Sequence, residues 1–366
     1  MVPSASLRRG AGARLAARGA RARPLSAAAQ PPPSATVTLR SGLRLQRPEL
    51  QYALSPALRS FVEERSAGRC RAVQLVADGA TEAFLSEARV ATNLQGAAHS
   101  LLKAFMSHYD ANALLDIYRL HLLSPPQLDT LLRAADDTVS GTAPNAASNA
   151  SAGAGAGTPR QFASAVDIGA GDGSVAERLL LPIAEHITCT ETARRMVDRI
   201  KAKLPAERCT ALNVDLSEDK YESNAPPGLE YGGHDLAILL NVLDRTNKPS
   251  TLLRRTAALL KPGGRLVVSV PLPFHGAHYS GSAVRVPAER LRVARPGTLL
   301  PLAQEDPQGA ATDWCHDAAW MLTEVLGPNV PLQVRAYSRV PYISWGDVGT
   351  PYYVFDTLVA VCTRPR

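Results

Sequence analysis

The sequence predicts an α/β protein whose sheet carries helices on both faces and follows a helical N-terminal lobe. From Phe162 onward, short apolar runs alternate with helical segments, which is the pattern of parallel β-α-β units. A glycine-rich turn, Gly169 to Gly173, follows the first of these runs, where a doubly wound sheet turns from its first strand into its first helix. Before this part, apolar residues at helical spacing between residues 50 and 133 predict the lobe.

Residues 1–48 differ in composition from the rest of the chain. They contain nine arginines, no lysine and no acidic residue, and the first carboxylate is Glu49. This composition is typical of an organelle transit peptide, so we expect a disordered basic leader and organellar import, to a mitochondrion more than to a plastid. The protein would be cytoplasmic if the leader were not a transit peptide. The rest of the chain contains 31 basic and 33 acidic residues. Because this part is close to neutral, no nucleic-acid partner is expected.

Composition divides the rest of the chain into three parts. Residues 49–139 form the predicted helical lobe, in which Ser124 is a plausible N-cap before two prolines. Residues 140–160 are mostly Ala, Gly, Ser and Asn and predict a flexible insertion. Residues 161–366 form the main domain. No apolar run is long enough to span a bilayer.

The main domain is predicted element by element. We expect strands at 162–170, 187–191, 209–214, 235–243 and 265–273, and two closing strands at 332–343 and 352–363. Helices are expected at 174–186, 193–204, 250–264 and 314–327. Residues 276–312 contain many prolines and glycines and predict a long loop. Right-handed crossovers place the loops that follow the parallel strands at one edge of the sheet, so this loop is expected over the active edge.

Ligating residues for a metal are not expected. The five cysteines include no C-x-x-C pair, which favours free thiols, and His275 and His278 have no further ligand at suitable spacing.

Three ligand classes compete for the turn "DIGAGDG". A phosphate-binding P-loop ends in Gly-Lys-Ser/Thr, which is absent here. A dinucleotide loop reads G-x-G-x-x-G, but here the third glycine follows after one residue, and Asp172 stands where a pyrophosphate would approach. S-adenosylmethionine remains, because its amino-acid part carries an ammonium group and its sulfonium is cationic. We expect Asp167 to hold the ammonium group, while Gly169, Gly171 and Gly173 allow close backbone approach.

The ends of the next two strands supply further polar groups. Glu191 can accept hydrogen bonds from both ribose hydroxyls. Asn213 or Asp215 could receive the adenine amino group.

The fourth strand ends in "LLNVLDR". Asn241 and Asp244 are spaced so that one touches the cofactor and the other reaches a substrate. Alternatively, Asp244 caps the following helix or pairs with Arg245. Together these features predict a methyltransferase with the class I, Rossmann-like sheet.

Beyond these features, the chain resembles the DREV family, also called methyltransferase-like protein nine, whose members are protein-histidine N-pros-methyltransferases. The resemblance spans about residues 80 to 362. Its motifs are "FLSEA", "SLLKAFMS", "LLSPPQLDTLL", "DIGAGDG", "TET", "LLNVLDR", "LPFH", "SRVPY" and "YYVFD".

The resemblance implies that Glu191, Asn241 and Tyr342 contact the cofactor. It also implies that the target histidine lies near Asp244 and the Tyr352–Tyr353 pair, with Tyr353 in a catalytic position, although strand tyrosines are often only core residues. The expected partner is a protein or peptide with His-x-His segments. The leader and the longer insertions depart from the family.

The expected mechanism is positional. Imidazole with a pKa of about 6.5 is mostly neutral near pH 7, so no strong base is required. An acceptor at Asp244 for the Nε2 hydrogen would direct the Nδ1 lone pair toward the methyl group, with Asn241 fixing cofactor and ring. A methyltransferase acting on a small molecule or RNA, or a non-catalytic protein with the cofactor fold, would share the cofactor features.

Overall fold

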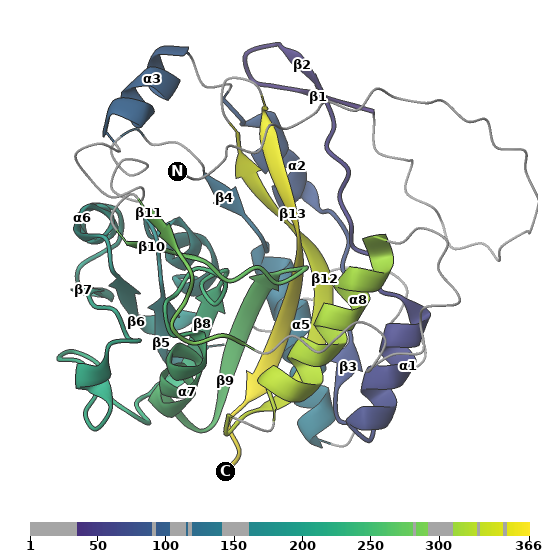
Figure 1. The fold of residues 1–366 in the computed structure, drawn as a ribbon, viewed down its shortest axis with the longest axis vertical. Coiled ribbons are helices and arrows are strands. Elements are labelled where there is room, and N and C mark those ends of the chain that lie inside the picture. The colour runs from purple at the N-terminus through teal and green to yellow at the C-terminus, as the bar shows by residue number, and fades with distance from the viewer. Residues whose placement is uncertain are drawn as a thin grey trace, which may run out of the picture. The chain divides into compact units, whose positions relative to one another are not determined.

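A nine-stranded sheet forms the centre of the folded chain (Figure 1). The computed structural model describes residues 35–89, 93–102, 115, 119–140, 161–280, 283–291, 310–327, 330–346 and 350–366. The strand order is β3-β12-β13-β9-β8-β5-β6-β7, with β4 beside β12. The strands are β3 (Arg71–Ala72), β4 (Leu120–His121), β5 (Phe162–Ile168), β6 (Ala184–Glu191), β7 (Cys209–Asn213), β8 (His234–Leu240), β9 (Leu260–Pro271), β12 (Gln333–Trp345) and β13 (Tyr352–Thr363).

Strand direction separates the sheet into two halves. β5 pairs in parallel with β6 and β8, and β6–β7 and β8–β9 are also parallel. β13 runs antiparallel to β9 and to β12. The chain crosses from one side of β5 to the other between β7 and β8, which is the switch point where ligands bind in open α/β sheets.

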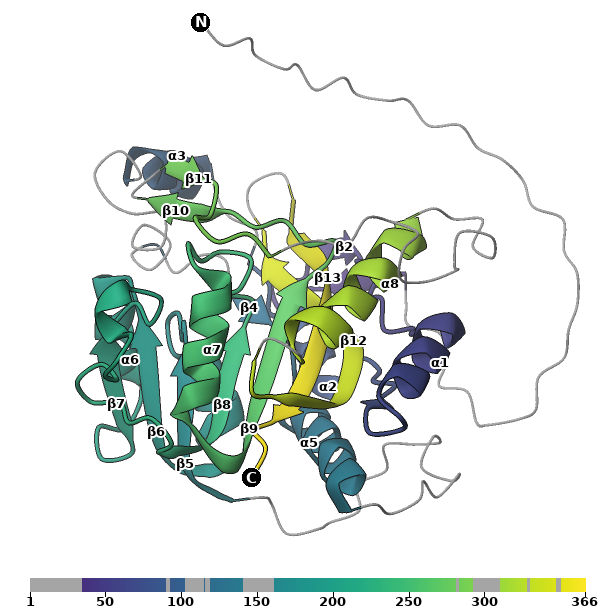
Figure 2. The same cartoon turned by 60° about the horizontal axis from the view of Figure 1, so that its bottom comes forward.

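Helices cover both faces of this sheet (Figure 2). The helices of the described residues are α1 (Pro56–Arg65), α2 (Gly79–Ser86), α3 (Asn93–Leu102), α5 (Pro125–Ser140), α6 (Arg194–Lys203), α7 (Pro249–Leu259) and α8 (Ala310–Trp320). Short π-helical segments span Ala176–Leu180 and Met321–Val325, and a 3-10 turn spans Asp219–Tyr221.

Alternating strand residues enter two separate apolar clusters. On β8, Leu236 and Ile238 pack in the cluster that holds α5 and α6, whereas Ala237 and Leu239 pack in the cluster that holds α1, α7 and α8. Each strand therefore needs apolar residues in both directions, which explains the continuous apolar runs in the sequence. The predicted Rossmann-like sheet with helices on both faces is confirmed.

The N-terminal part differs from the prediction in two respects. β1 (Thr36–Thr38) and β2 (Arg44–Gln46) form a small antiparallel sheet, so residues 36–46 of the predicted disordered leader are folded. They fold because Val37 and Leu39 are buried in a cluster with Leu85 of α2. Residues 1–34 lie outside the described residues.

The predicted helical lobe is also not purely helical. β3 pairs with residues 336–337 of β12, and β4 pairs with residues 343–344, so this part completes the main sheet. The long strand β12 requires these partners for its outer edge. Ser124 is confirmed as a cap: its Oγ accepts from the Gln127 backbone N–H (3.2 Å), and the Gln127 side chain accepts from the Ser124 N–H (3.0 Å).

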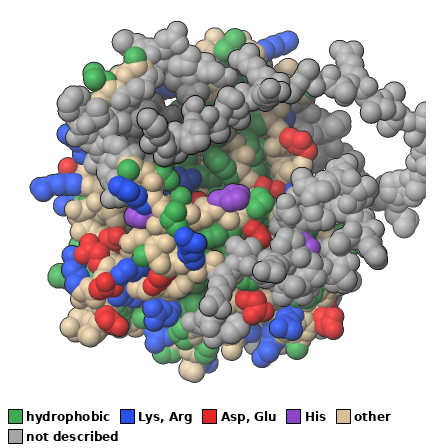
Figure 3. Space-filling model, in the orientation of Figure 1, with side chains coloured by type: hydrophobic (Ala, Val, Ile, Leu, Met, Phe, Trp, Pro, Cys, Tyr) green, Lys and Arg blue, Asp and Glu red, His purple; other side chains and the backbone are tan. Residues whose placement is uncertain are grey.

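The predicted loop at 276–312 contains a hairpin, β10 (His278–Ser280) with β11 (Ala283–Arg285). Residues 292–309 of this loop, and residues 141–160 of the predicted insertion, lie outside the described residues. No described helix is long and apolar enough to cross a membrane. On the face that Figure 3 shows, acidic and basic side chains are intermingled, in line with their nearly equal numbers after residue 48.

Candidate active site

A cavity of about 860 Å³ opens where β5, β6, β7 and β8 end. Its floor consists of residues that follow these strands, and its far wall comes from β12, β13 and the β10 hairpin. The carboxyl ends of parallel strands meet at this edge, so residues far apart in the sequence line one space. Seven of the ten predicted site residues line it: Asp167, Gly169, Gly171, Glu191, Asn241, Tyr342 and Tyr353.

Asp167 is a buried carboxylate at the end of β5. Its exposed fraction is 3%, and its Oδ2 atom is buried without a hydrogen-bond partner. Burial, and secondly the charge of Glu191, raises the pKa of Asp167 to about 8. An unpartnered carboxylate in a cavity favours a cationic ligand, because a cation would restore the interactions lost on burial.

The three glycines of the turn have different roles. All have positive φ, at +71° for Gly169, +57° for Gly171 and +80° for Gly173. A Cβ atom at Gly169 would lie 2.7 Å from Cγ2 of Val242, whereas one at Gly171 would meet open space. Gly173 does not line the cavity; a Cβ there would lie 3.2 Å from Ile200, so this glycine lets α6 pack closely.

Asp172 is less available to a ligand than the sequence indicated. Lys203 forms an ion pair with its Oδ2 (2.7 Å), and the Ser174 N–H donates to Oδ1 (3.0 Å). Burial favours a higher pKa for Asp172, but the hydrogen bond and charge of Lys203 bring this pKa below its ordinary value. Its negative charge is therefore paired within the protein.

Glu191 ties the second strand to the glycine turn. Its Oε2 accepts a hydrogen bond from the Gly171 N–H (2.9 Å), and its Oε1 accepts from Thr192 N (2.7 Å) and Ala193 N (3.1 Å). Oε2 keeps a lone pair for a further donor in the cavity. Glu191 thus holds the glycine turn in place and can also accept a hydrogen bond from a ligand hydroxyl group.

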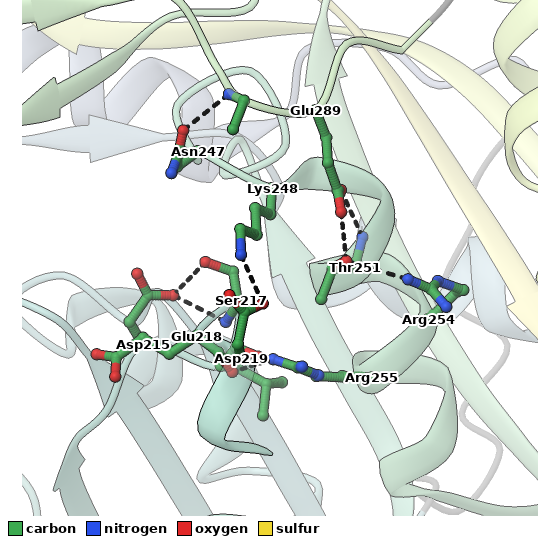
Figure 4. Close-up of polar contacts among 12 residues, drawn as sticks. Asp215, Ser217, Glu218, Asp219, Asn247, Lys248, Thr251, Arg254, Arg255 and Glu289 are labelled. Carbon is green, nitrogen blue, oxygen red and sulfur yellow. Dashed lines mark hydrogen bonds and ion pairs between the residues drawn. The ribbon is translucent and has the colours of Figure 1, made fainter. Parts of the chain in front are cut away.

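The end of β7 presents Asp215, not Asn213. The Asn213 amide donates to the carbonyl oxygens of Glu191 and Thr192 (2.9 Å each), and the residue does not line the cavity. Asp215 lines it, and its Oδ1 accepts from Ser217 N (2.8 Å) and Oγ (2.7 Å) (Figure 4). Of the two residues expected for the adenine amino group, only Asp215 therefore reaches the cavity, because the Asn213 side chain satisfies the carbonyls at the end of the neighbouring strand.

Asn241 adopts the left-handed backbone conformation, with φ at +56°. Its backbone N–H donates to the Ser269 carbonyl oxygen (3.0 Å), and its Oδ1 accepts from the Ser269 hydroxyl (2.8 Å). Because Oδ1 is engaged, Asn241 offers its NH2 donor to a ligand. Asparagine tolerates this conformation better than most residues with a side chain.

Asp244 lies next to the cavity and does not line it. Its side chain is 13% exposed, Oδ2 lies 3.4 Å from Nε of Arg245, and Oδ1 is buried without a partner. Burial raises the pKa of Asp244. Asp244 therefore pairs with Arg245, which is one of the two alternatives, but it does not cap the next helix, α7.

A strap formed by residues 277–280 and 283–289 holds the loop that carries Asp244. Ala277 N donates to the Asp244 carbonyl oxygen (2.9 Å), and Ala288 N donates to Oδ1 of Asn247 (2.8 Å). The Glu289 carboxylate accepts from Thr251 N (2.9 Å) and Oγ1 (2.5 Å), which caps α7 (Figure 4). Sequence reasoning missed Glu289: the helix was predicted from residue 250, whereas α7 begins at Pro249 after Lys248, which provides no capping side chain.

Aromatic side chains of β12 and β13 form the far wall of the cavity. Tyr342 and Phe355 are register partners whose ring centroids lie 5.7 Å apart, and Tyr353 points to the same face of β13 as Phe355. Tyr352 points to the opposite face, where its hydroxyl donates to the Leu85 carbonyl oxygen (2.6 Å). The expected role of Tyr352 near the substrate was therefore wrong, whereas Tyr353 does line the cavity.

Two further sequence expectations concern sulfur and metals. The five cysteines are free thiols, as expected. Of the two loop histidines, His278 lines the cavity and His275 does not. Among the described residues, no cluster of His, Cys, Asp and Glu is suited to hold a metal ion.

A family model described as DREV methyltransferase matches residues 66–364 of the chain. Among similar solved structures is the N-methyltransferase NodS of Bradyrhizobium japonicum WM9 with S-adenosyl-L-homocysteine, at 12% identity and TM-score 0.31, covering 66% of this chain and 89% of that one. The 1,6-didemethyltoxoflavin-N1-methyltransferase of Burkholderia thailandensis matches at 16% identity and TM-score 0.32, covering 57% and 72%. An S-adenosylmethionine dependent methyltransferase of Mesorhizobium loti matches at 17% identity and TM-score 0.33, covering 56% and 92%.

Proposed function

This chain belongs to the DREV methyltransferase family, and we propose that it transfers a methyl group from S-adenosylmethionine to the pros (Nδ1) nitrogen of histidine. The proposed substrates are proteins or peptides with His-x-His segments. One observation carries the cofactor part of this proposal: the buried Oδ2 of Asp167 lacks a partner in a cavity that runs on to an aromatic wall.

The residues at the strand ends fit such a cofactor. Asp167 suits the ammonium of its amino-acid end, and Oε2 of Glu191 suits a ribose hydroxyl. Asp215 takes the place of Asn213 as the group proposed for the adenine amino donor. When bound, S-adenosylmethionine supplies an electrophilic methyl group.

The far side of the cavity suits a planar ring. Tyr342, Tyr353 and Phe355 offer aromatic faces against which an imidazole can stack. We assign Oδ1 of Asp244 as the acceptor for the Nε2 hydrogen, since it is buried next to the cavity and has no partner. This contact selects the Nδ1 lone pair as the nucleophile, and the carboxylate stabilises the imidazolium as it forms.

The Asp244→Asn substitution tests this assignment. We expect turnover on a His-x-His peptide to fall by about 100-fold or more, equivalent to about 2.7 kcal/mol, because an amide stabilises the developing imidazolium poorly. The dissociation constant of S-adenosylhomocysteine should stay within about threefold, since the contact assigned to Asp244 is with the imidazole and not with the cofactor. Amino-acid analysis of the labelled product for pros-methylhistidine provides the measurement.

The matched control is Asp198→Asn, which changes an exposed aspartate on α6. Equal turnover in Asp244→Asn and the wild type would remove Asp244 from the mechanism. If label entered RNA or small molecules from an organelle lysate but no His-x-His peptide, the histidine substrate would be wrong while methyltransferase activity remained.

We also propose that the arginine-rich segment before β1 directs the protein into an organelle, with the mitochondrion favoured. N-terminal sequencing of the mature protein from fractionated cells would identify cleavage and compartment together.

A further inference from the structure

We propose that Arg178 binds the carboxylate of the cofactor's amino-acid end, so that Asp167 and Arg178 together recognise a zwitterionic α-amino-acid group. This inference rests on the proposed cofactor and is independent of histidine as the methyl acceptor.

Arg178 lies within the short helical segment that follows the glycine turn. It belongs to the π-helical segment Ala176–Leu180 and lines the cavity. Its Nε and Nη2 atoms are both buried and have no hydrogen-bond partner. Burial lowers the pKa of Arg178, while the charges of Asp172 and Glu177 act in the opposite direction.

The other cations around the cavity are already engaged. Arg119, Arg199 and Arg245 also line it, and each has an interaction partner within the protein. Lys203, next to the cavity, is held by Asp172 and Ser174. Among the described arginines that line the cavity, Arg178 therefore stands out by two buried donors without an acceptor.

The nearby acids do not supply that acceptor. Asp172 and Glu177 lie close enough to affect the charge of Arg178, but neither accepts a hydrogen bond from its buried nitrogens. Asp172 is occupied by Lys203 and Ser174, and Glu177 is exposed. A ligand with two acceptor oxygens in one plane matches the guanidinium, whose Nε and Nη2 donors form a fork.

The charge pattern of the cavity identifies the ligand group. Oδ2 of Asp167 is an acceptor without a donor, and Nε and Nη2 of Arg178 are donors without an acceptor. An α-amino acid carries an ammonium and a carboxylate on one carbon, and these are the two groups that would complement the unpaired acceptor and donors among the residues that line the cavity. A nucleoside without the amino-acid end can satisfy neither of them.

Isothermal titration calorimetry of the full chain with three ligands tests the inference. S-adenosylhomocysteine has both charged groups, decarboxylated S-adenosylmethionine lacks the carboxylate, and 5′-deoxy-5′-methylthioadenosine lacks the whole amino-acid end. In Arg178→Met we expect about 10- to 100-fold weaker binding of S-adenosylhomocysteine, the range for lost hydrogen bonds between charged groups. Binding of the other two ligands should change less than twofold, and Arg178→Lys should restore part of the affinity.

The matched control is Arg133→Met, which removes an exposed arginine of α5 that pairs with Asp129. Thermal melting of each variant reports whether it is folded. If the wild type binds none of the three ligands, the proposed cofactor is wrong and the inference falls with it. If the wild type binds S-adenosylhomocysteine and Arg178→Met binds it equally well, only the inference is overturned. Equal weakening of all three ligands would also overturn it, by showing that Arg178 acts on the fold of the site.

Discussion

Asp167 is buried where β5 meets the glycine turn, and its protonation should control ligand binding. Its pKa in the protein, about 8, lies above the ordinary value of 3.8, because burial disfavours the carboxylate. Between these two values the folded protein holds a proton that the unfolded chain has released. The free energy of unfolding of the ligand-free protein should therefore decrease as pH rises through this window.

The same pKa predicts a change in proton linkage. At pH 6.5 a ligand ammonium must displace the proton of Asp167, so binding of S-adenosylhomocysteine should release about one proton. At pH 9 Asp167 is mostly ionised before the ligand binds, so this proton release should largely disappear. Calorimetry in buffers of different ionisation enthalpy measures the number of protons exchanged on binding at each pH. Release of the same size in Asp167→Asn would exclude this aspartate as the source.

At the scale of single residues, sequence reasoning was right for most, but not all, of the residues at strand ends. Asp167, Glu191 and Asn241 reach the cavity because the carboxyl ends of parallel strands meet there. It failed for Asn213 and Tyr352, since the direction of a side chain depends on register and on competing hydrogen bonds that a motif does not contain. The polar groups of Arg178 could not be identified as unpartnered from sequence, because this depends on what surrounds them.

Among the elements, the strap is expected to stabilise both α7 and the loop that carries Asp244. Glu289 caps a helix whose own N-cap, Lys248, provides no side-chain bond. In Glu289→Gln the charge that favours the helix N-terminus is lost, so the free energy of unfolding should fall by about 1 kcal/mol. The KM for a peptide substrate should rise, because the loop from Asp244 to Asn247 is attached to the same strap.

Urea unfolding and steady-state kinetics measure these two effects. Glu185→Gln, at an exposed position at the start of β6, is the control and should leave both unchanged. The dissociation constant of S-adenosylhomocysteine should also stay constant in Glu289→Gln. An unchanged KM for the peptide would show that the strap does not affect peptide binding.

Element types were largely predictable, whereas their boundaries and long-range partners were not. The parallel strands and their helices follow from apolar periodicity, but β6 begins at Ala184, inside the region predicted as helix. β9 likewise begins at Leu260, inside the predicted helix 250–264. The β10 hairpin lies in a region whose prolines and glycines hide its short strands. A strand of three residues is too short to show a periodic pattern of apolar residues.

For the molecule as a whole, the boundary of the folded unit is testable. The compact unit extends from Ser34 to Arg366, so it includes residues that the composition assigned to the leader. Deleting residues 1–33 should leave the free energy of unfolding unchanged. Deleting residues 1–48 should lower it by roughly 2–5 kcal/mol, because the buried side chains of Val37 and Leu39 are lost together with the Arg47–Glu82 ion pair.

Urea unfolding of both truncated proteins beside the full chain measures this difference. Equal stability of the two deletions would mean that β1 and β2 contribute nothing to the fold. The sequence concealed this boundary, because the segment shares the arginine-rich, acid-free composition of the residues before it, and two buried apolar residues are too few for a periodic signal.

The contact between Gly169 and Val242 limits how this site can diverge. The glycine turn meets the start of the loop that carries Asp244 at this contact, and no room is left for a Cβ atom at residue 169. The space available to residue 169 therefore depends on the side chain at residue 242. A larger residue at 242 cannot be accommodated by shrinking residue 169 further, because glycine is already the smallest residue. A change at residue 242 should therefore alter the glycine turn and the loop that carries Asp244 at the same time.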